Sequence, residues 1–148
     1  MARKSVKPNE DGVPTIELRN LQRNVPVNLQ NLQSFAERAL RACSKRAMQQ
    51  FEEIVVVLIS DNRMADLHRR FMNQRGPTDV ITFQHGEIFI SVSTAKRQAR
   101  EFGTSTRAEI ELYIVHGLLH LSGFDDRTPR ATRRMRAAEA RVLKDAAV

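Results

Sequence analysis

The sequence has little sulfur, few aromatic side chains and no long apolar run. Cys43 is the only cysteine among 148 residues, so no disulfide can form within the chain and a cysteine-based zinc finger is excluded. A single thiol is typical of a protein of the reducing cytoplasm, where we expect this one. No apolar run approaches the ~20 residues of a membrane-spanning helix. The polar segment from Met1 to Pro14 has no apolar core of a secretory signal.

Acidic side chains are outnumbered by basic ones. The 24 Lys and Arg residues against 17 Asp and Glu give a net charge of +7, and the pI is near 10.5. Such an excess favours a polyanionic partner, either a nucleic acid or an anionic membrane, although many small basic proteins have neither. With seven Phe, one Tyr and no Trp, a base-stacking platform is not the expected mode of binding. Contacts to phosphates should dominate instead.

The length and the composition, 41% apolar and 28% charged, predict one globular domain. We expect a disordered polar tail over residues 1–13 and a single α+β domain over residues 14–148. Hydrophobic periodicity predicts a small mixed four-stranded sheet and about five helices. The strands are expected at 15–19, 54–59, 79–83 and 87–91. The helices are expected from after residue 26 to about 46, then at about 61–71, 92–102, 106–121 and 131–144.

Local patterns place several of these elements. The β-branched run 54–59 is typical of a central strand buried on both faces. Cys43 continues the apolar stripe of the first helix and is expected in the core. Thr106 and Glu109 have the spacing of a capping box. Pro129 is expected in the loop before the last helix.

The most specific segment reads His-Gly-Leu-Leu-His-Leu-Ser-Gly-Phe-Asp-Asp and begins at His116. His116 and His120 are four residues apart, so on a helix they share one face and can bind one divalent ion. Gly123 can end that helix in the left-handed conformation, after which Asp125 or Asp126 offers a carboxylate to the same ion. Three protein ligands with an open position are typical of a catalytic zinc site.

Glu109 lies on the same helix face, about two turns before His116. It could accept an imidazole N–H or order the ligands. A histidine pair at this spacing is weak by itself. Here, however, it lies in the most apolar helix of the chain, where two buried imidazoles need partners. We therefore favour a metal site and give His68 and His85 no role.

The glycine at position 117 bears on the reaction. A zinc metalloprotease would show His-Glu-x-x-His, whose Glu is the general base, and Gly117 occupies that position. The spacing His-x3-His-x2-Gly-x2-Asp is similar to the metzincin frame, but peptide hydrolysis would lack its proton acceptor. The basic charge favours a phosphodiester substrate instead.

Three blocks in order resemble the YbeY family, the metal-dependent endoribonucleases of ribosomal RNA maturation. The family pattern His-Gly-x-Leu-His-Leu-x-Gly-[Tyr/Phe]-Asp-His is matched throughout residues 116–125. Pro-Thr-Asp-Val-[Leu/Ile]-[Ser/Thr]-Phe is matched by residues 77–83, and Gly-[Asp/Glu]-Ile-x-Ile-Ser by residues 86–91. Further family positions are occupied by Gln98, Glu109 and Met135. The resemblance covers most of the chain from about residue 15.

The resemblance implies a zincin-like histidine helix that holds one Zn²⁺ per chain through His116, His120 and the following third ligand. That ligand is histidine in the family, and Asp126 stands in its place. A carboxylate is a shorter and harder ligand, so we expect weaker zinc binding and greater tolerance of other divalent metals such as manganese. Glu109 is assigned a catalytic role.

A second departure from the family precedes the second block. The family has Asn-x-x-[Tyr]-Arg there, with the arginine implicated in activity, and the aligned residue in this chain is Met72. Methionine cannot stabilise a phosphate, so we expect Arg69, Arg70 or Arg75 to substitute from a neighbouring position. Arg70 is assigned this catalytic role.

Basic residues cluster in residues 63–75, 96–107 and 127–148. The first two clusters flank the predicted hairpin and the histidine helix, and we assign RNA binding to Arg69, Arg70, Arg75 and Arg97. The third has seven basic and two acidic residues, a net charge of +5, and could equally contact a ribosomal partner. The alternative for each cluster is a solvated helix face.

Together these features predict a single-strand-specific, metal-dependent endoribonuclease. The resemblance implies that it matures the 3′ end of small-subunit ribosomal RNA, acts in ribosome quality control, and has ribosomal RNA and ribosomal or assembly proteins as partners. Asp126 and Met72 motivate one alternative, a non-catalytic ribosome assembly factor with a structural or vestigial metal. The other alternative is a zincin-like metalloprotease, against which Gly117 is the main observation.

Overall fold

Four strands form one mixed sheet in the computed structural model, which describes residues 12–72 and 78–148. The strands are β1 (Thr15–Asn20), β2 (Glu53–Ile59), β3 (Val80–Phe83) and β4 (Glu87–Ser91), and they lie in the order β1-β2-β4-β3. β1 and β4 run parallel to β2, whereas β3 and β4 form an antiparallel hairpin. The predicted α+β class, the mixed four-stranded sheet and the hairpin are therefore confirmed.

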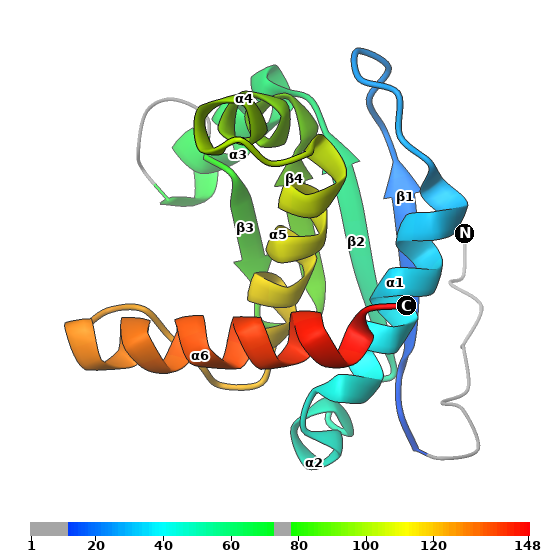
Figure 1. Ribbon diagram of the computed structural model, residues 1–148, viewed down its shortest axis with the longest axis vertical. Helices are drawn as coiled ribbons and strands as arrows, with labels where there is room; N and C mark the ends of the chain where they lie inside the picture. The colour runs from blue at the N-terminus through cyan, green and yellow to red at the C-terminus, as the bar shows by residue number, and fades with distance from the viewer. Residues whose placement is uncertain (1–11, 73–77) are drawn as a thin grey trace.

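Six helices in the described ranges surround this sheet: α1 (Leu29–Ala42), α2 (Lys45–Met48), α3 (Asp61–Met72), α4 (Val92–Phe102), α5 (Thr106–Leu121) and α6 (Pro129–Ala146). α1 packs on β1, and α5 packs on β3 and β4. α6 crosses α1 and α5 on their outer side, while α3 covers part of the opposite face of the sheet (Figure 1). Within residues 12–72 and 78–148, no helix has the length and apolar character that crossing a membrane requires.

The strand β2 is central and buried on both faces, as its β-branched run predicts. Val56 and Leu58 belong to the main core beneath α1 and α5. Val57 and Ile59 point the other way, since side chains alternate along a strand, and pack with Met64 of α3. The strand thus joins the helical layers on the two faces of the sheet.

The long helix α5 is apolar on nearly every side because other elements enclose it. It packs against the sheet, α1, α4 and α6. Cys43 is buried in the same core, as predicted, and burial raises the pKa of its thiol to about 11. Val13, the last residue of the expected polar tail, is also buried against this core, while residues 1–11 of that tail lie outside the described residues.

The first predicted helix is too long. It was expected to reach about Arg46, but α1 ends at Ala42 and Cys43 has extended backbone. Ser44 then starts the short helix α2, because its side chain accepts a hydrogen bond from the Ala47 N–H. This second start explains why the structure has six helices rather than about five.

The predicted capping box at the start of α5 is wrong. Ser105, not Thr106, caps the helix, and its Oγ accepts a hydrogen bond of 3.0 Å from the Ala108 N–H. Glu109 instead accepts a hydrogen bond of 2.7 Å from the Thr104 hydroxyl. The carboxylate is therefore held by the residue before the cap rather than by the cap itself.

The last helix also begins earlier than predicted. α6 starts at Pro129, which was expected in the loop, whereas the prediction began it at about Ala131. Thr128 accepts a hydrogen bond of 3.0 Å from the Ala131 N–H and caps the helix. Proline is favoured just after such a cap, because the N–H that it lacks has no helical partner there.

Gly117 allows α5 to lie close to the sheet. A Cβ atom at this position would lie 2.8 Å from both Cδ1 and Cγ2 of Ile88, which is fully buried in β4. The absence of a side chain at position 117 therefore sets the separation between the histidine helix and the strand beneath it.

We expect Gly117→Ala to destabilise the fold by about 1–3 kcal/mol, the usual effect of an added methyl group in a packed core. Urea unfolding of the purified protein measures this change. In an Ile88→Ala background the same substitution should be nearly neutral, because the colliding atoms are gone. An equal loss of stability in both backgrounds would contradict the proposed contact.

Candidate metal centre

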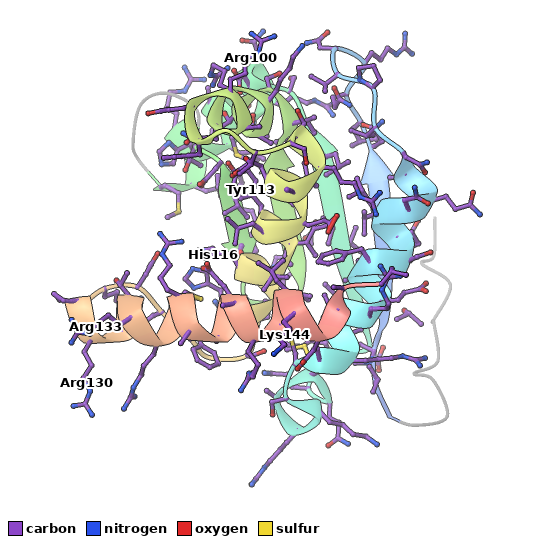
Figure 2. The ribbon with its side chains drawn as sticks, viewed as in Figure 1. Arg100, Tyr113, His116, Arg130, Arg133 and Lys144 are labelled. Carbon is purple, nitrogen blue, oxygen red and sulfur yellow. The ribbon has the colours of Figure 1, made fainter. Side chains whose placement is uncertain are left out.

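His116, His120 and Asp126 come together where α5 ends and α6 begins. Their potential ligand atoms all lie within 4.8 Å of one another. Nε2 of His116 is 2.9 Å from Nε2 of His120 and 3.9 Å from Oδ2 of Asp126. Figure 2 shows His116 on α5 facing the neighbouring α6. The three side chains could hold one metal ion.

The turn after α5 selects which of the two aspartates joins the histidines. Gly123 has a φ of 101°, which is the left-handed region expected of it, and its N–H donates to the His120 carbonyl at 3.1 Å. Asp125 accepts a hydrogen bond of 3.1 Å from the Arg127 N–H, so its carboxylate is used within the turn. Asp126 is the aspartate that faces the imidazoles.

A buried carboxylate on α6 orients the first histidine. Oε1 of Glu139 lies 2.8 Å from Nδ1 of His116, and Glu139 is only 3% exposed. Because an ionised carboxylate only accepts hydrogen bonds, Nδ1 of His116 carries the proton. Its Nε2 therefore presents a lone pair toward His120 and Asp126. This arrangement of carboxylate, imidazole and open lone pair is how proteins prepare a histidine for a metal.

The surroundings of the second histidine, His120, favour its neutral form. Burial lowers the pKa of His120, and the nearby imidazole of His116 lowers it further. Asp126 and a backbone hydrogen bond at Phe124 act in the opposite direction without reversing the shift. A lowered pKa keeps the imidazole neutral near pH 7, and neutral imidazole is the form that binds metals.

A polar cavity of about 340 Å³ opens beside this ligand group. His116 and Asp126 line it together with further polar side chains from the residue before β3 and from α4, α5 and α6: Asp79, Gln98, Glu109, Tyr113, Arg136 and Glu139. Carboxylates outnumber basic side chains in the lining, which favours a cation inside. Among the described lining residues, Arg136 is the one with a permanent positive charge, and its Nη1 lies 3.3 Å from Oε2 of Glu139.

Glu109 lies in this cavity, but it does not accept the proton of His116, which was one of the two roles expected of it. Glu139 accepts that proton instead. Glu109 is buried, bonded to Thr104, and close enough to the Tyr113 hydroxyl for a hydrogen bond. Burial raises the pKa of that phenol, and Asp79 and Glu109 raise it further, so Tyr113 stays protonated. A catalytic role for Glu109 remains a prediction.

Two of the arginines expected to compensate for Met72, Arg69 and Arg70, are not among the residues that line this cavity. Arg69 and Arg70 are exposed at the end of α3, and both contact Asp66, at 2.9 and 3.3 Å. Met72 itself is 52% exposed. Arg75 lies outside the described residues. The catalytic role of Arg70 and the RNA-binding roles of these arginines stay predictions.

Arg97 is also engaged within the protein. It forms an ion pair with Asp61, which additionally accepts hydrogen bonds from the Ser91 and Thr94 hydroxyls. Burial raises the pKa of Asp61, but the bonds from Arg97, Ser91 and Thr94 outweigh burial and the pKa is lowered. This network connects α3 to the start of α4, and RNA binding by Arg97 stays a prediction.

Sequence reasoning missed Glu139 and Arg136. A signal for Glu139 was present, since it interrupts the apolar stripe formed by Met135, Ala138 and Val142 on the last helix. A carboxylate on such a stripe must have a partner, because burying it alone is unfavourable. No pattern marked Arg136 among the many arginines of that helix.

The donor set fits a divalent metal. Two imidazoles and one carboxylate form the ligand combination of many catalytic zinc sites, and a carboxylate behind the first imidazole completes the usual outer support. The fold and this group define a small α+β domain with a His-x3-His helix whose histidines, together with Asp126, could hold a metal ion.

Comparison with known proteins identifies the family. A family model described as Endoribonuclease YbeY matches residues 17–147, and the chain belongs to that family. Relatives named Endoribonuclease YbeY include one from Thermobifida fusca, 34% identical over 91% of this chain and 88% of the relative. Another, from Nautilia profundicola, is 39% identical over 63% of this chain and 71% of the relative.

A solved structure supports the fold. The solution structure of a protein from Thermotoga maritima superimposes with a TM-score of 0.61, covering 88% of this chain and 91% of that one. Its sequence identity is 23%, so this likeness concerns the fold alone. The recognition of the family from three sequence blocks is confirmed.

We expect Asp126→Ala to weaken Zn²⁺ binding by at least about 10-fold, since loss of even an outer-shell partner typically has that effect. Titration calorimetry on the metal-free protein measures the affinity. Asp125→Ala is the matched control, because it removes the adjacent carboxylate, which lies outside the ligand group. Equal affinities for the two variants would remove Asp126 from the ligand set.

We expect Glu139→Ala to weaken Zn²⁺ binding by about 10–100-fold, because His116 loses the acceptor that orients it. Glu139→Gln should retain more affinity, since its amide oxygen can still accept the imidazole proton. Thermal unfolding of the metal-free variants separates lost stability from lost affinity. Unchanged zinc affinity in a folded Glu139→Ala variant would contradict this role.

Proposed function

We propose that this protein is a metal-dependent endoribonuclease that cleaves single-stranded RNA in ribosomal RNA maturation. The observation that carries the proposal is the group of His116, His120 and Asp126, with Glu139 behind it and Arg136 beside it, in a chain of a family named for endoribonuclease activity. The 3′ end of small-subunit ribosomal RNA is the proposed substrate, and ribosome quality control the wider role.

The residues of the chain divide the chemistry among themselves. A divalent ion bound here supplies a Lewis acid for a phosphate and for a water molecule. His116, His120 and Asp126 would hold that ion, with Glu139 fixing the orientation of His116. Arg136 stabilises the negative charge that develops on the phosphate, which is the role that positioned cations have in phosphoryl transfer. Glu109, which lies in the same cavity and accepts a hydrogen bond from Thr104, is proposed to accept or donate a proton during cleavage.

The proposed cofactor is one Zn²⁺ per chain. Asp126 is a harder ligand than the histidine of the family, so manganese and other divalent ions are proposed to support the site as well. The proposed partners are ribosomal RNA and ribosomal or assembly proteins, which places the protein in the cytoplasm.

One structural observation bears on each of two alternative functions. A non-catalytic ribosome assembly factor is favoured by Met72, which is exposed at the position of the family arginine. A zincin-like protease is disfavoured by Gly117. A glutamate at that position would place its Cβ against Ile88 of the sheet, so the general base of a protease does not fit without a shift.

The nuclease proposal is tested by RNA cleavage with and without a chelator. We expect a single-stranded fragment of small-subunit ribosomal RNA to be cut, the chelator to abolish cutting, and added Zn²⁺ or Mn²⁺ to restore it. A fully paired RNA of the same sequence should resist. RNA and metal binding without any cleavage would favour the assembly factor, and chelator-sensitive digestion of casein would favour the protease.

Arg136→Gln should lower kcat by about 10²–10³-fold, the usual effect of removing a group that stabilises transition-state charge. Its metal content should stay the same, because Arg136 is not among the ligands. Arg141→Gln, an exposed arginine further along α6, is the matched control. If both variants cleave equally well, Arg136 has no part in the reaction.

A further inference from the structure

We propose that the N-terminal half of α6 binds the sugar–phosphate backbone of a single RNA strand that enters the metal site. This inference rests on the proposed function and names the surface that holds the substrate. We define the α6 arginine surface as four residues: Arg130, Arg133 and Arg134 on the first turns of the helix, and Arg127 just before it. Arg136 connects it to the metal cavity.

The α6 arginine surface is a concentrated positive charge, and an acidic residue beside it, Asp125, lines a cavity together with Arg130 and Arg134. No Asp or Glu occurs between Asp126 and Glu139, and Glu139 is buried and already bonded to His116. All four arginines of the surface are exposed. Like charges on one helical end repel one another, so a polyanion that settles there relieves that repulsion.

Unlike most of the arginines near the sheet, these arginines form no ion pair with a carboxylate of the described residues. Within the described ranges, no arginine of the α6 arginine surface forms an ion pair. Arg69 and Arg70 share Asp66, and Arg97 is paired with Asp61. A phosphate must compete with a carboxylate at those three positions, whereas on α6 it meets free guanidinium groups.

The positive charge extends from the metal site across the helix. Arg133 is three residues before Arg136, so it lies on the same side of α6 as the metal cavity that Arg136 lines. Arg130 and Arg134 line a second, open cavity of about 450 Å³ beside the turn that carries the third ligand. From residue 129, where α6 begins, to residue 136 the helix rises about 10 Å, which is long enough to contact more than one phosphate of a strand.

The surface is also accessible. Figure 1 shows the N-terminal half of α6 extending beyond the edge of the sheet at β3, and Figure 2 shows Arg130 and Arg133 on this free end. The large exposed apolar side chains of the described residues are Leu21, Phe71, Met72, Phe102 and Val148. None of these lies within the surface, which therefore lacks the apolar centre of a protein interface. Charge without an apolar centre favours a phosphate backbone over an acidic protein.

The test compares two triple variants of the full chain with equal loss of charge. One is Arg130→Gln, Arg133→Gln and Arg134→Gln. The control is Arg23→Gln, Arg41→Gln and Arg46→Gln, three arginines that are exposed elsewhere on the protein. Fluorescence anisotropy measures the Kd of a labelled single-stranded oligouridine at several salt concentrations between 50 and 200 mM.

We expect the α6 triple variant to lower the slope of log affinity against log salt by about 2, since each lost phosphate contact on a single strand contributes about 0.7. Its Kd at 50 mM salt should rise at least 10-fold more than that of the control. Replacing the same three arginines by lysine should keep most of the slope, because the charge remains. Equal slopes and equal Kd values in the two glutamine variants would overturn the inference.

Two further outcomes separate this inference from the proposed function. If the wild-type protein cleaves RNA and the α6 triple variant binds and cleaves as the control does, the surface is wrong and the nuclease proposal stands. If the wild-type protein never cleaves but the α6 variant alone loses RNA binding, the nuclease proposal is wrong and the surface stands. Selective loss of polyglutamate binding, with RNA binding equal to the control, would overturn the inference in favour of an acidic protein.

Discussion

The hydrogen bond between Glu139 and His116 is the interaction on which the site depends. It joins α6 to α5 through two largely buried side chains, and leaving one partner of such a buried hydrogen bond unpaired usually destabilises a protein by about 1–3 kcal/mol. It also decides where the proton of His116 resides, and hence which nitrogen faces the metal. Because the bond fixes α6 against the histidine helix, it sets the positions of Arg136 and of the arginines before it.

Charge is distributed in two zones around this bond. The charged side chains that line the cavity beside the ligands are four carboxylates and one arginine, and this excess of negative charge suits a divalent cation. The free end of α6 outside it is strongly basic, which suits an anionic strand. Arg136 lies at the boundary, in contact with Glu139 and with the cavity. A net charge of +7 is thus compatible with an acidic centre, because the two signs occupy different places.

The two departures from the family pattern have different structural settings. Asp126 is accommodated, since the turn at Gly123 brings its carboxylate within reach of both imidazoles. Met72 is exposed at the end of α3, and the arginines beside it contact Asp66 rather than the cavity. Arg136 reaches the cavity from another helix. A positive charge therefore lies at the candidate metal site, although it comes from a different part of the chain than the family arginine.

Hydrophobic periodicity and residue spacing were enough to predict much of the fold and part of the candidate site. They predicted the sheet, the hairpin, the central strand β2, and the histidine pair on one helix face, because these features depend on neighbours in the chain. The interrupted first helix and the early start of α6 were missed, since single side chains, Ser44 and Thr128, decide where a helix begins.

Spacing alone left Asp125 and Asp126 open as the third ligand, and the resemblance to the family pointed to Asp126. Only the tertiary structure could select Glu139 over Glu109 as the partner of His116. That choice depends on how α6 packs across α5, with its stripe of Met135 and Val142 against the core. Contacts between residues 23 positions apart leave no mark in local spacing. The sequence determined the chemistry that was available, and the packing of two helices decided which side chains met.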